Sequence, residues 1–169
     1  MTGRRIAVLT SGGDAPGMNA AIRAVTRCAL SEGWAIAGVR HGFLGRIEGK
    51  FDQLTARSVG GILRRGGTMP GSARCPELQT EEGRRPTLRS LHQADVDALV
   101  VIGRKGSQTG AFALSQTGFP EVGVASTIDN VLAGSDITIR VGAGRGWRAG
   151  RHAAGPGAHC AAGADRRNP

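Results

Sequence analysis

A glycine-rich turn near the start of the chain carries the first residues whose types and spacing could do chemistry. Gly12, Gly13 and Gly17 fall within residues 11–17, between an apolar run and a stretch of helical spacing. Glycines let backbone N–H groups approach an anion closely, and a helix N-terminus adds positive potential. The turn matches neither of the common glycine-rich nucleotide motifs. It therefore indicates either a phosphate-binding site or only a tight connection between a strand and a helix.

Asp129, within the tetrapeptide Thr-Ile-Asp-Asn at residues 127–130, is the second candidate. A carboxylate within hydrogen-bond reach of a hydroxyl group can act as a general base. An aspartate in such a pattern can also form a turn or cap a helix. The tetrapeptide alone leaves both roles open.

The elements around the glycine-rich turn follow a simple alternation. Residues 6–10 and 35–39 are short apolar runs of the kind found in buried strands. Between them, residues 19–32 place apolar side chains at helical spacing, with Asn19 as the expected N-cap and Gly33 just after the end. Strand, helix and strand at this spacing predict the βαβ unit of a parallel sheet.

The rest of the body repeats this alternation. We expect helices at residues 59–65, 81–94 (interrupted by Pro86) and 107–117, and strands at residues 98–102 and 122–125. Two strands end in glycine-containing turns that open helices, as strands do in doubly wound folds. The predicted fold class is therefore α/β, a Rossmann-like doubly wound parallel sheet with ligands at the carboxyl ends of its strands.

Composition excludes several classes of protein. No apolar run approaches the ~18 residues of a membrane span, and the first residues lack the apolar segment of a secretory signal. We therefore expect a cytoplasmic protein with no membrane partner. Cys28, Cys75 and Cys160 are odd in number and widely spaced, which argues against a disulfide framework and against a CxxC-type zinc site.

The pattern changes abruptly after Ile139. Ala, Gly and Arg make up 21 of the 30 residues at 140–169, and this stretch adds strongly to the net charge of +9. We therefore expect a domain at residues 1–139 and a tail at 140–169, without a packed core in the tail. The tail could be a basic disordered segment that binds polyanions, an inert solvated segment, or an out-of-frame translation of GC-rich DNA. The abruptness of the change favours the last.

The segment from Thr10 to Arg23, TSGGDAPGMNAAIR, resembles without a change the string that follows the first strand of ATP-dependent 6-phosphofructokinases. Other motifs of that family follow in order, at residues 65–68 (RGGT), 71–74 (GSAR), 99–103, 106–107, 118–120 and 127–130. The resemblance covers residues 4–139. It predicts the N-terminal, ATP-binding part of such an enzyme, incomplete and truncated by a frame change near residue 140.

The resemblance implies transfer of the γ-phosphoryl group of ATP to the 1-hydroxyl of fructose 6-phosphate, with Mg²⁺, as a step of glycolysis. It also implies a homotetramer. Asp129 would be the catalytic base, and Thr127 would contact the substrate. Arg23 and Arg27 would bind an allosteric nucleotide at a subunit interface. The residues expected to contact ATP are Gly12, Arg74, Cys75, Gly103, Gly106 and Ser107.

Two positions depart from the family pattern. The second phosphate loop, GGDGS in the family, is GRKGS at residues 103–107, so Lys105 occupies the position of an aspartate that helps to hold Mg²⁺. A lysine cannot ligate Mg²⁺, which needs oxygen ligands, and we expect no metal ligand there. Val131 replaces a second aspartate, beside the base. Residues 140–169 match none of the family's sugar-phosphate ligands, so we predict negligible kinase activity for this chain.

Two other functions remain open at this point. The chain could be a non-enzymatic, degenerate nucleotide-binding domain with a basic tail that binds polyanions. It could also be a pyrophosphate-dependent relative, because the loop that usually separates phosphoryl donors has changed. Nucleic acid is not an expected partner, since Trp147 is the only aromatic residue in the tail on which a base could stack.

Overall fold

A five-stranded sheet forms the centre of the molecule. The computed structural model describes residues 3–13, 15–40, 51–71, 80–127 and 138–139. The strand order is β3-β2-β1-β4-β5, and all neighbours are parallel except β3, which is antiparallel to β2. The strands are β1 (Arg5–Ser11), β2 (Ala35–Val39), β3 (Phe51–Gln53), β4 (Ala98–Gly103) and β5 (Glu121–Ala125).

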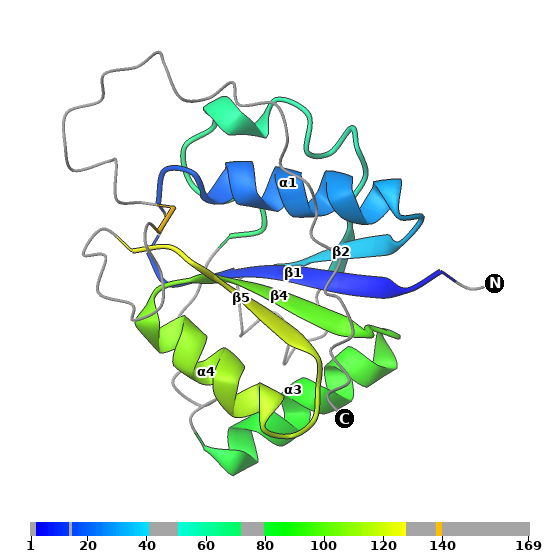
Figure 1. The fold of residues 1–169 in the computed structure, drawn as a ribbon, viewed down its shortest axis with the longest axis vertical. Coiled ribbons are helices and arrows are strands. Elements are labelled where there is room, and N and C mark those ends of the chain that lie inside the picture. Colours follow the sequence, from blue (N-terminus) through cyan, green and yellow to red (C-terminus); the bar gives the residue numbers. More distant parts are fainter. Residues whose placement is uncertain (1–2, 14, 41–50, 72–79, 128–137, 140–169) are drawn as a thin grey trace, which may run out of the picture.

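Helices cover both faces of this sheet, as the doubly wound prediction requires. The helix α1 lies over one face, and the helices α3 and α4 lie over the other (Figure 1). They are α1 (Met18–Ser31), α3 (Glu81–Gln93) and α4 (Lys105–Ser115), together with the short 3-10 helix η1 (Ile62–Arg64). The predicted α/β fold class is therefore confirmed, including the helix that contains Pro86.

The core follows from the two-residue period of the central strands. In β1, Ile6 and Val8 pack with α1, whereas Ala7 and Leu9 pack with α3 and α4. Each of these side chains is less than a tenth exposed. A strand buried on both faces must be apolar throughout, as β1 is. Each fully buried aliphatic side chain stabilises the fold by roughly 1.5–3 kcal/mol, so this layer holds the ends of the strands firmly in place.

The start of α1 differs from the prediction. The N-cap is Gly17, with φ +91°, and the predicted cap Asn19 lies inside the helix. The prediction failed because the left-handed Gly17 turns the chain earlier than a polar cap would. The side chain of Asn19 is thereby free to bond to another segment, as described below. Gly33 follows the end of α1 with φ +73°, as predicted.

Three further predictions need correction. The strand β3 was not predicted, and its antiparallel pairing means that the sheet is not wholly parallel. The helix expected at residues 59–65 is reduced to the three residues of η1. Cys28 is disulfide-bonded, although the number and spacing of the cysteines argued against disulfides. Its partner lies outside the described residues.

The pair β2 and β3 is tied by a charge contact at its end. Arg40, directly after β2, donates a hydrogen bond from Nε to Oδ2 of Asp52 in β3. This hydrogen bond and the negative charge of Asp52 raise the pKa of Arg40 above its ordinary value. The contact is exposed, so it guides the register of β3 more than it stabilises the fold.

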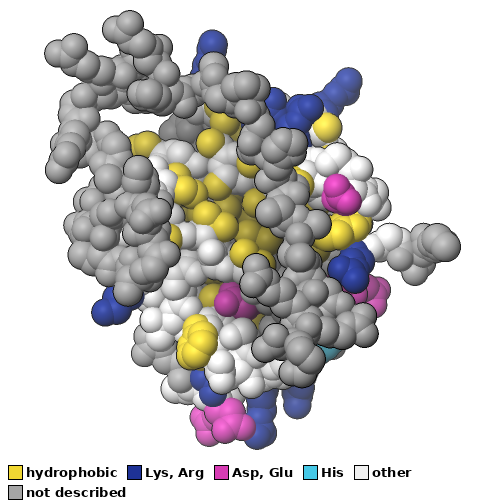
Figure 2. All heavy atoms as spheres, in the orientation of Figure 1, with side chains coloured by type: hydrophobic (Ala, Val, Ile, Leu, Met, Phe, Trp, Pro, Cys, Tyr) yellow, Lys and Arg dark blue, Asp and Glu magenta, His cyan; other side chains and the backbone are white. Residues whose placement is uncertain are grey.

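Apolar side chains are exposed at the β5 edge of the sheet. Figure 2 shows hydrophobic side chains gathered near the middle of the face on which Figure 1 draws β5. Val122 in β5 and Phe112 in α4 are both more than half exposed. None of the helices in the described ranges is long and apolar enough to cross a membrane.

Candidate functional site

The candidate site lies where the order of the strands reverses. The chain passes from β1 through α1 to β2 on one side, whereas β4 pairs with β1 on the other side. Ser11, the last residue of β1, is in register with Gly103, the last residue of β4. The turns after these two strands therefore meet at the carboxyl edge of the sheet. In doubly wound folds this reversal point is where ligands bind.

Both helices that begin at this edge start without a side-chain cap. The N-caps are Gly17 for α1 and Arg104 for α4, and neither side chain accepts a hydrogen bond from the helix. In contrast, Thr80 caps α3 by accepting a hydrogen bond from the N–H of Gly83 at 3.2 Å. A helix start without a side-chain cap leaves N–H groups available to an anion. Among the three described α-helices, α1 and α4 have this property and α3 does not.

The turn after β1 requires glycine for its backbone conformation. Gly12 has φ +97° and Gly17 has φ +91°, a region that other residues rarely adopt. A Cβ at Gly17 would also stand 2.5 Å from Cγ2 of Ile139. The glycines therefore set the path of the turn and bring the start of α1 beside residue 139.

The turn after β4 requires glycine for space. A Cβ at Gly103 would stand 2.6 Å from both Oγ of Ser107 and the carbonyl oxygen of Ser11. The hydroxyl of Ser107 donates a hydrogen bond to that same carbonyl, at 3.1 Å. This buried bond joins the start of α4 directly to the end of β1, and it fixes the two turns relative to each other.

Two cations stand in the second turn. Arg104 is half-buried and Lys105, the first residue of α4, is exposed. The side chain of Arg104 reaches toward the first turn, because a Cβ at Gly12 would lie 3.8 Å from its Cγ. The positive charges therefore lie at the same edge as the open helix starts, and the electrostatics of the edge favour anions.

A third segment is bonded to this edge from a distance in sequence. The side-chain amide of Asn19 donates to the carbonyl oxygens of Ile62, Arg65 and Gly67, at 3.0–3.1 Å. Its Oδ1 accepts a hydrogen bond from the N–H of Met69 at 3.0 Å. The sequence pattern missed this role, because a lone asparagine near a helix start is typical of a cap.

The end of β1 is tied to the same segment. The buried hydroxyl of Thr10 donates to the carbonyl oxygen of Gly71 at 3.0 Å. Gly71 opens the GSAR motif, whose predicted ligand Arg74 lies outside the described residues. Gly71, the one residue of this motif that the structure describes, is therefore bonded to the candidate site.

The carboxyl end of β5 completes the edge. The N–H of Ser126 donates to the carbonyl oxygen of Gly103 at 2.9 Å. Thr127 is buried, and its carbonyl oxygen accepts a hydrogen bond from the hydroxyl of Thr138. The residues that flank 128–137 on both sides therefore lie next to the two glycine turns.

The structure brings five of the predicted site residues to this edge: Gly12, Gly103, Gly106, Ser107 and Thr127. Arg23 and Arg27 lie elsewhere, more than a turn along α1, where Nη1 of Arg23 is buried without a hydrogen-bond partner among the described residues. Arg74, Cys75 and Asp129 lie outside the described residues, as does Val131.

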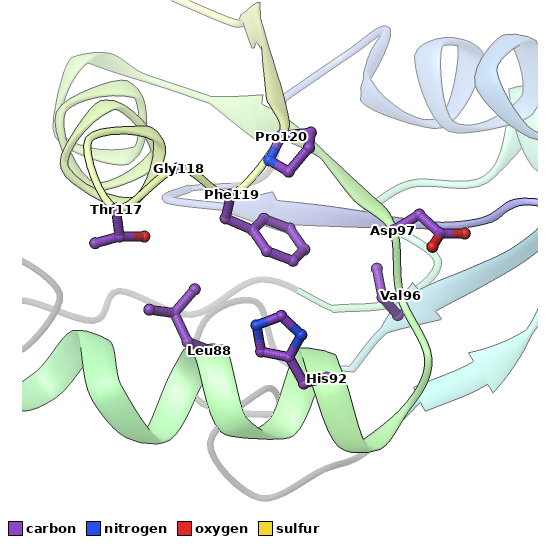
Figure 3. A pocket seen from close by; sticks show the side chains of 8 residues that line it. All are labelled: Leu88, His92, Val96, Asp97, Thr117, Gly118, Phe119 and Pro120. Carbon is purple, nitrogen blue, oxygen red and sulfur yellow. The ribbon is translucent and has the colours of Figure 1, made fainter.

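A separate hollow of about 340 Å³ lies at the opposite end of the strands. In Figure 3, Leu88 and His92 of α3 point toward Phe119, with the His92 and Phe119 rings edge to face at 5.9 Å between centroids. Asp97, which directly precedes β4, also lines it. Since the glycine turns follow the carboxyl ends of the strands, this hollow is not part of the candidate site.

The comparison with family models agrees with the arrangement of turns. The model described as Phosphofructokinase matches residues 5–143. The chain belongs to the phosphofructokinase family. The match begins with β1 and runs past both glycine turns and the end of β5, so every described element of the candidate site lies within the phosphofructokinase region.

Curated phosphofructokinases are similar over the same region. Proteins named ATP-dependent 6-phosphofructokinase from Listeria welshimeri and Edwardsiella ictaluri are 53% and 52% identical over 136 residues, which is 80% of this chain. The alignment covers 43% and 42% of those two proteins. The chain therefore spans less than half the length of the curated phosphofructokinases that it matches.

Solved phosphofructokinase structures share the fold. The Pichia pastoris phosphofructokinase in the T-state matches 83% of this chain and 17% of its own, with a TM-score of 0.76 and 36% identity. A pyrophosphate-dependent phosphofructokinase from Marinobacter aquaeolei matches 75% of this chain and 34% of its own, with a TM-score of 0.65 and 20% identity. The second match shows the fold alone and carries no information about the phosphoryl donor of this chain.

Proposed function

We propose that the two glycine turns bind the phosphate chain of ATP, as the nucleotide half-site of a 6-phosphofructokinase. The observation that carries the proposal is the buried bond from Ser107 to the carbonyl of Ser11, which joins two uncapped helix starts at the reversal point of the sheet. Uncapped helix starts leave backbone N–H groups for an anion, and the bond from Ser107 holds the two starts together, which supports one shared phosphate site. The relatives at about 53% identity are named as ATP-dependent enzymes, which supports ATP as the donor.

The residues around the turns take distinct roles in this proposal. Backbone N–H groups at Gly12 and Gly106 face the phosphates, and Gly103 leaves room for the bond from Ser107 that fixes the two turns. Arg74 and Cys75 follow Gly71 and approach the nucleotide from the segment that Thr10 holds. A guanidinium group beside the transferring phosphoryl group neutralises charge that develops in the transition state.

The transfer step uses residues that follow β5 in the sequence. The 1-hydroxyl oxygen of fructose 6-phosphate forms a bond to the γ-phosphorus of ATP, and the bond between that phosphorus and the β–γ bridging oxygen breaks. Asp129 takes the hydroxyl proton, Thr127 contacts the sugar phosphate, and ADP leaves with the bridging oxygen. The support is the position of Thr127 just past the carboxyl end of β5, next to Ser126, whose N–H bonds to the carbonyl of Gly103.

The family implies Mg²⁺, and the side chains of the two glycine turns decide whether they could hold it. Mg²⁺ takes oxygen ligands and is usually held by carboxylates and substrate phosphates. The described residues 11–13 and 103–107 contain no carboxylate, and no cluster of three His, Cys, Asp or Glu occurs anywhere in the described ranges. Without a carboxylate, residues 103–107 do not fit a magnesium site.

We also propose an effector role for Arg23 and Arg27, at a contact between subunits of a homotetramer. The two residues are four positions apart on α1, so they lie on the same side of that helix. The unsatisfied, buried Nη1 of Arg23 supports a missing anionic partner. Both residues are distant from the glycine turns, as a separate regulatory site requires.

Calorimetric titration with ATP tests the half-site. We expect saturable binding at one site, and we expect Gly106→Glu to weaken it at least ten-fold, because a carboxylate in the second turn repels phosphate. The space around Gly106 is open, so the variant should fold. Gln116→Glu, at the far end of α4, adds the same charge and should change the affinity less than two-fold.

A coupled assay for fructose 1,6-bisphosphate tests the transfer step separately. We expect the 169-residue chain alone to turn over below about 1% of the 1–100 s⁻¹ usual for kinases, because positioning of both substrates is what a kinase supplies. Absence of ATP binding, or equal loss in both charge variants, would contradict the half-site. Turnover in the ordinary range would contradict the second expectation and leave the first intact.

A further inference from the structure

The second glycine turn presents cations where a metal-bound nucleotide would need oxygen ligands. Lys105 is exposed at the first position of α4, and Arg104 occupies the N-cap position with its side-chain methylenes toward Gly12. Ser107, two residues after Lys105, is buried and bonded to the end of β1. The cations therefore stand on a rigid base at the edge where the proposed phosphate site lies.

A divalent cation is disfavoured at this position for two reasons. The backbone and hydroxyl oxygens of residues 103–107 include no charged ligand, and Mg²⁺ keeps its water molecules unless strong oxygen ligands replace them. An ammonium and a guanidinium group within the same turn also repel a bound cation, and this repulsion extends to about 8–10 Å at ordinary ionic strength. Both effects act only on the metal, and neither acts against the phosphates.

The same two cations favour the binding of a phosphate chain that carries no metal. Without Mg²⁺, a triphosphate keeps its full negative charge and all of its oxygen acceptors. An ammonium group forms short, charge-assisted hydrogen bonds with such oxygens, and lysine acts on phosphate as a point charge. The uncapped N–H groups at the start of α4 add donors beside Lys105.

We propose that this site takes a nucleoside triphosphate in its metal-free form, with Lys105 in direct contact with the phosphate chain. The inference rests on the proposed half-site and adds which ionic form of the nucleotide is preferred. Lys105 replaces the metal in neutralising the phosphates, and Arg104 adds charge beside the first turn. The chain therefore discriminates against the magnesium complex.

The test is calorimetric titration of the full chain with ATP in two media of equal ionic strength, one with excess EDTA and one with excess MgCl₂. We expect ATP in EDTA to bind at least ten-fold more tightly than the magnesium complex. Lys105→Asp should weaken binding in EDTA at least ten-fold and remove the preference. Lys105→Gln should give an intermediate loss.

Arg89→Asp is the matched control, because it makes the same change of charge at an exposed position near the end of α3. It should shift neither dissociation constant more than two-fold, and circular dichroism should be unchanged in all variants. Binding of wild type only with Mg²⁺, or unchanged binding by Lys105→Asp, overturns the inference and leaves the half-site intact. Failure to bind ATP in both media overturns the half-site as well.

Discussion

The turn after β1 and the turn after β4 do the same structural task with different means. Each joins the end of a parallel strand to a helix that starts without a side-chain cap. The first uses glycine for a left-handed backbone at Gly12, whereas the second uses glycine for close approach at Gly103. The first belongs to a string shared with the family, and the second carries two cations. Turns of similar composition can therefore tolerate quite different substitutions.

The two turns also differ in what holds them. The amide of Asn19 in α1 bonds to a separate segment at residues 62–69. The amide of Gln108 in α4 bonds to strand carbonyls instead, at Val101, Gly103 and Val124. The helix after the first turn thus binds a loop from more than forty residues away, whereas the second turn is supported by its own strands.

The largest effect is expected from Asn19→Ala. Loss of its side chain leaves three carbonyls and one N–H of residues 62–69 without their partner, where the bond to Ile62 is buried and the other three are part-buried. It should lower the free energy of unfolding by about 3 kcal/mol. Gln108→Ala should cost about 1 kcal/mol, because that side chain is only half-buried. Urea unfolding measures both. Equal losses in the free energy of unfolding would mean that the side-chain hydrogen bonds of Asn19 and Gln108 stabilise their turns to the same extent.

The next effect is expected from Gly103→Ala, which should destabilise the chain by about 2 kcal/mol because its Cβ meets a backbone oxygen and Ser107. Gly106→Ala, in the same turn, has no atom within 4 Å of its Cβ and should be neutral or stabilising by up to about 1 kcal/mol. A similar loss from both variants would refute the explanation by close approach.

A smaller effect is expected from Gly12→Ala, about 1 kcal/mol, since the left-handed backbone is strained by a side chain although space for Cβ exists. Asparagine tolerates this conformation better than alanine, so Gly12→Asn should recover part of the loss. Gly103→Asn should recover none of the lost stability, because position 103 has no space for a side chain of any type. The two pairs of variants, compared by thermal unfolding, separate the two uses of glycine. Recovery at position 103 would break the comparison.

Local features of this fold were predictable from sequence, and long-range ones were not. The strands β1, β2, β4 and β5 contain apolar runs, and β1 and β4 lead into glycine-containing turns, so short-range pattern sufficed. The strand β3 has three residues, two of them polar, and gives no periodic signal. It forms because β2 offers an open edge, which is a property of the assembled sheet.

In the candidate site, too, the local features were predictable from sequence and the long-range contacts were not. The glycine turns at residues 11–17 and 103–107 were found because turn chemistry is local. The bond from Thr10 to Gly71 spans 61 residues, and the bonds of Asn19 span 43 to 50. No periodicity connects such partners, so Asn19 was predicted as a cap. Its true role follows from the left-handed Gly17, which places the helix start before it.

The most direct test of the central claim is amide NMR of the full chain during titration with ATP. The two-turn site predicts that the largest shifts occur at Gly12, Gly13, Gly106 and Ser107, together at one saturating concentration. Amides around the hollow at Leu88 and Phe119 should stay unchanged. Shifts confined to residues 140–169, or to that hollow, would contradict the claim that the two turns form one phosphate site.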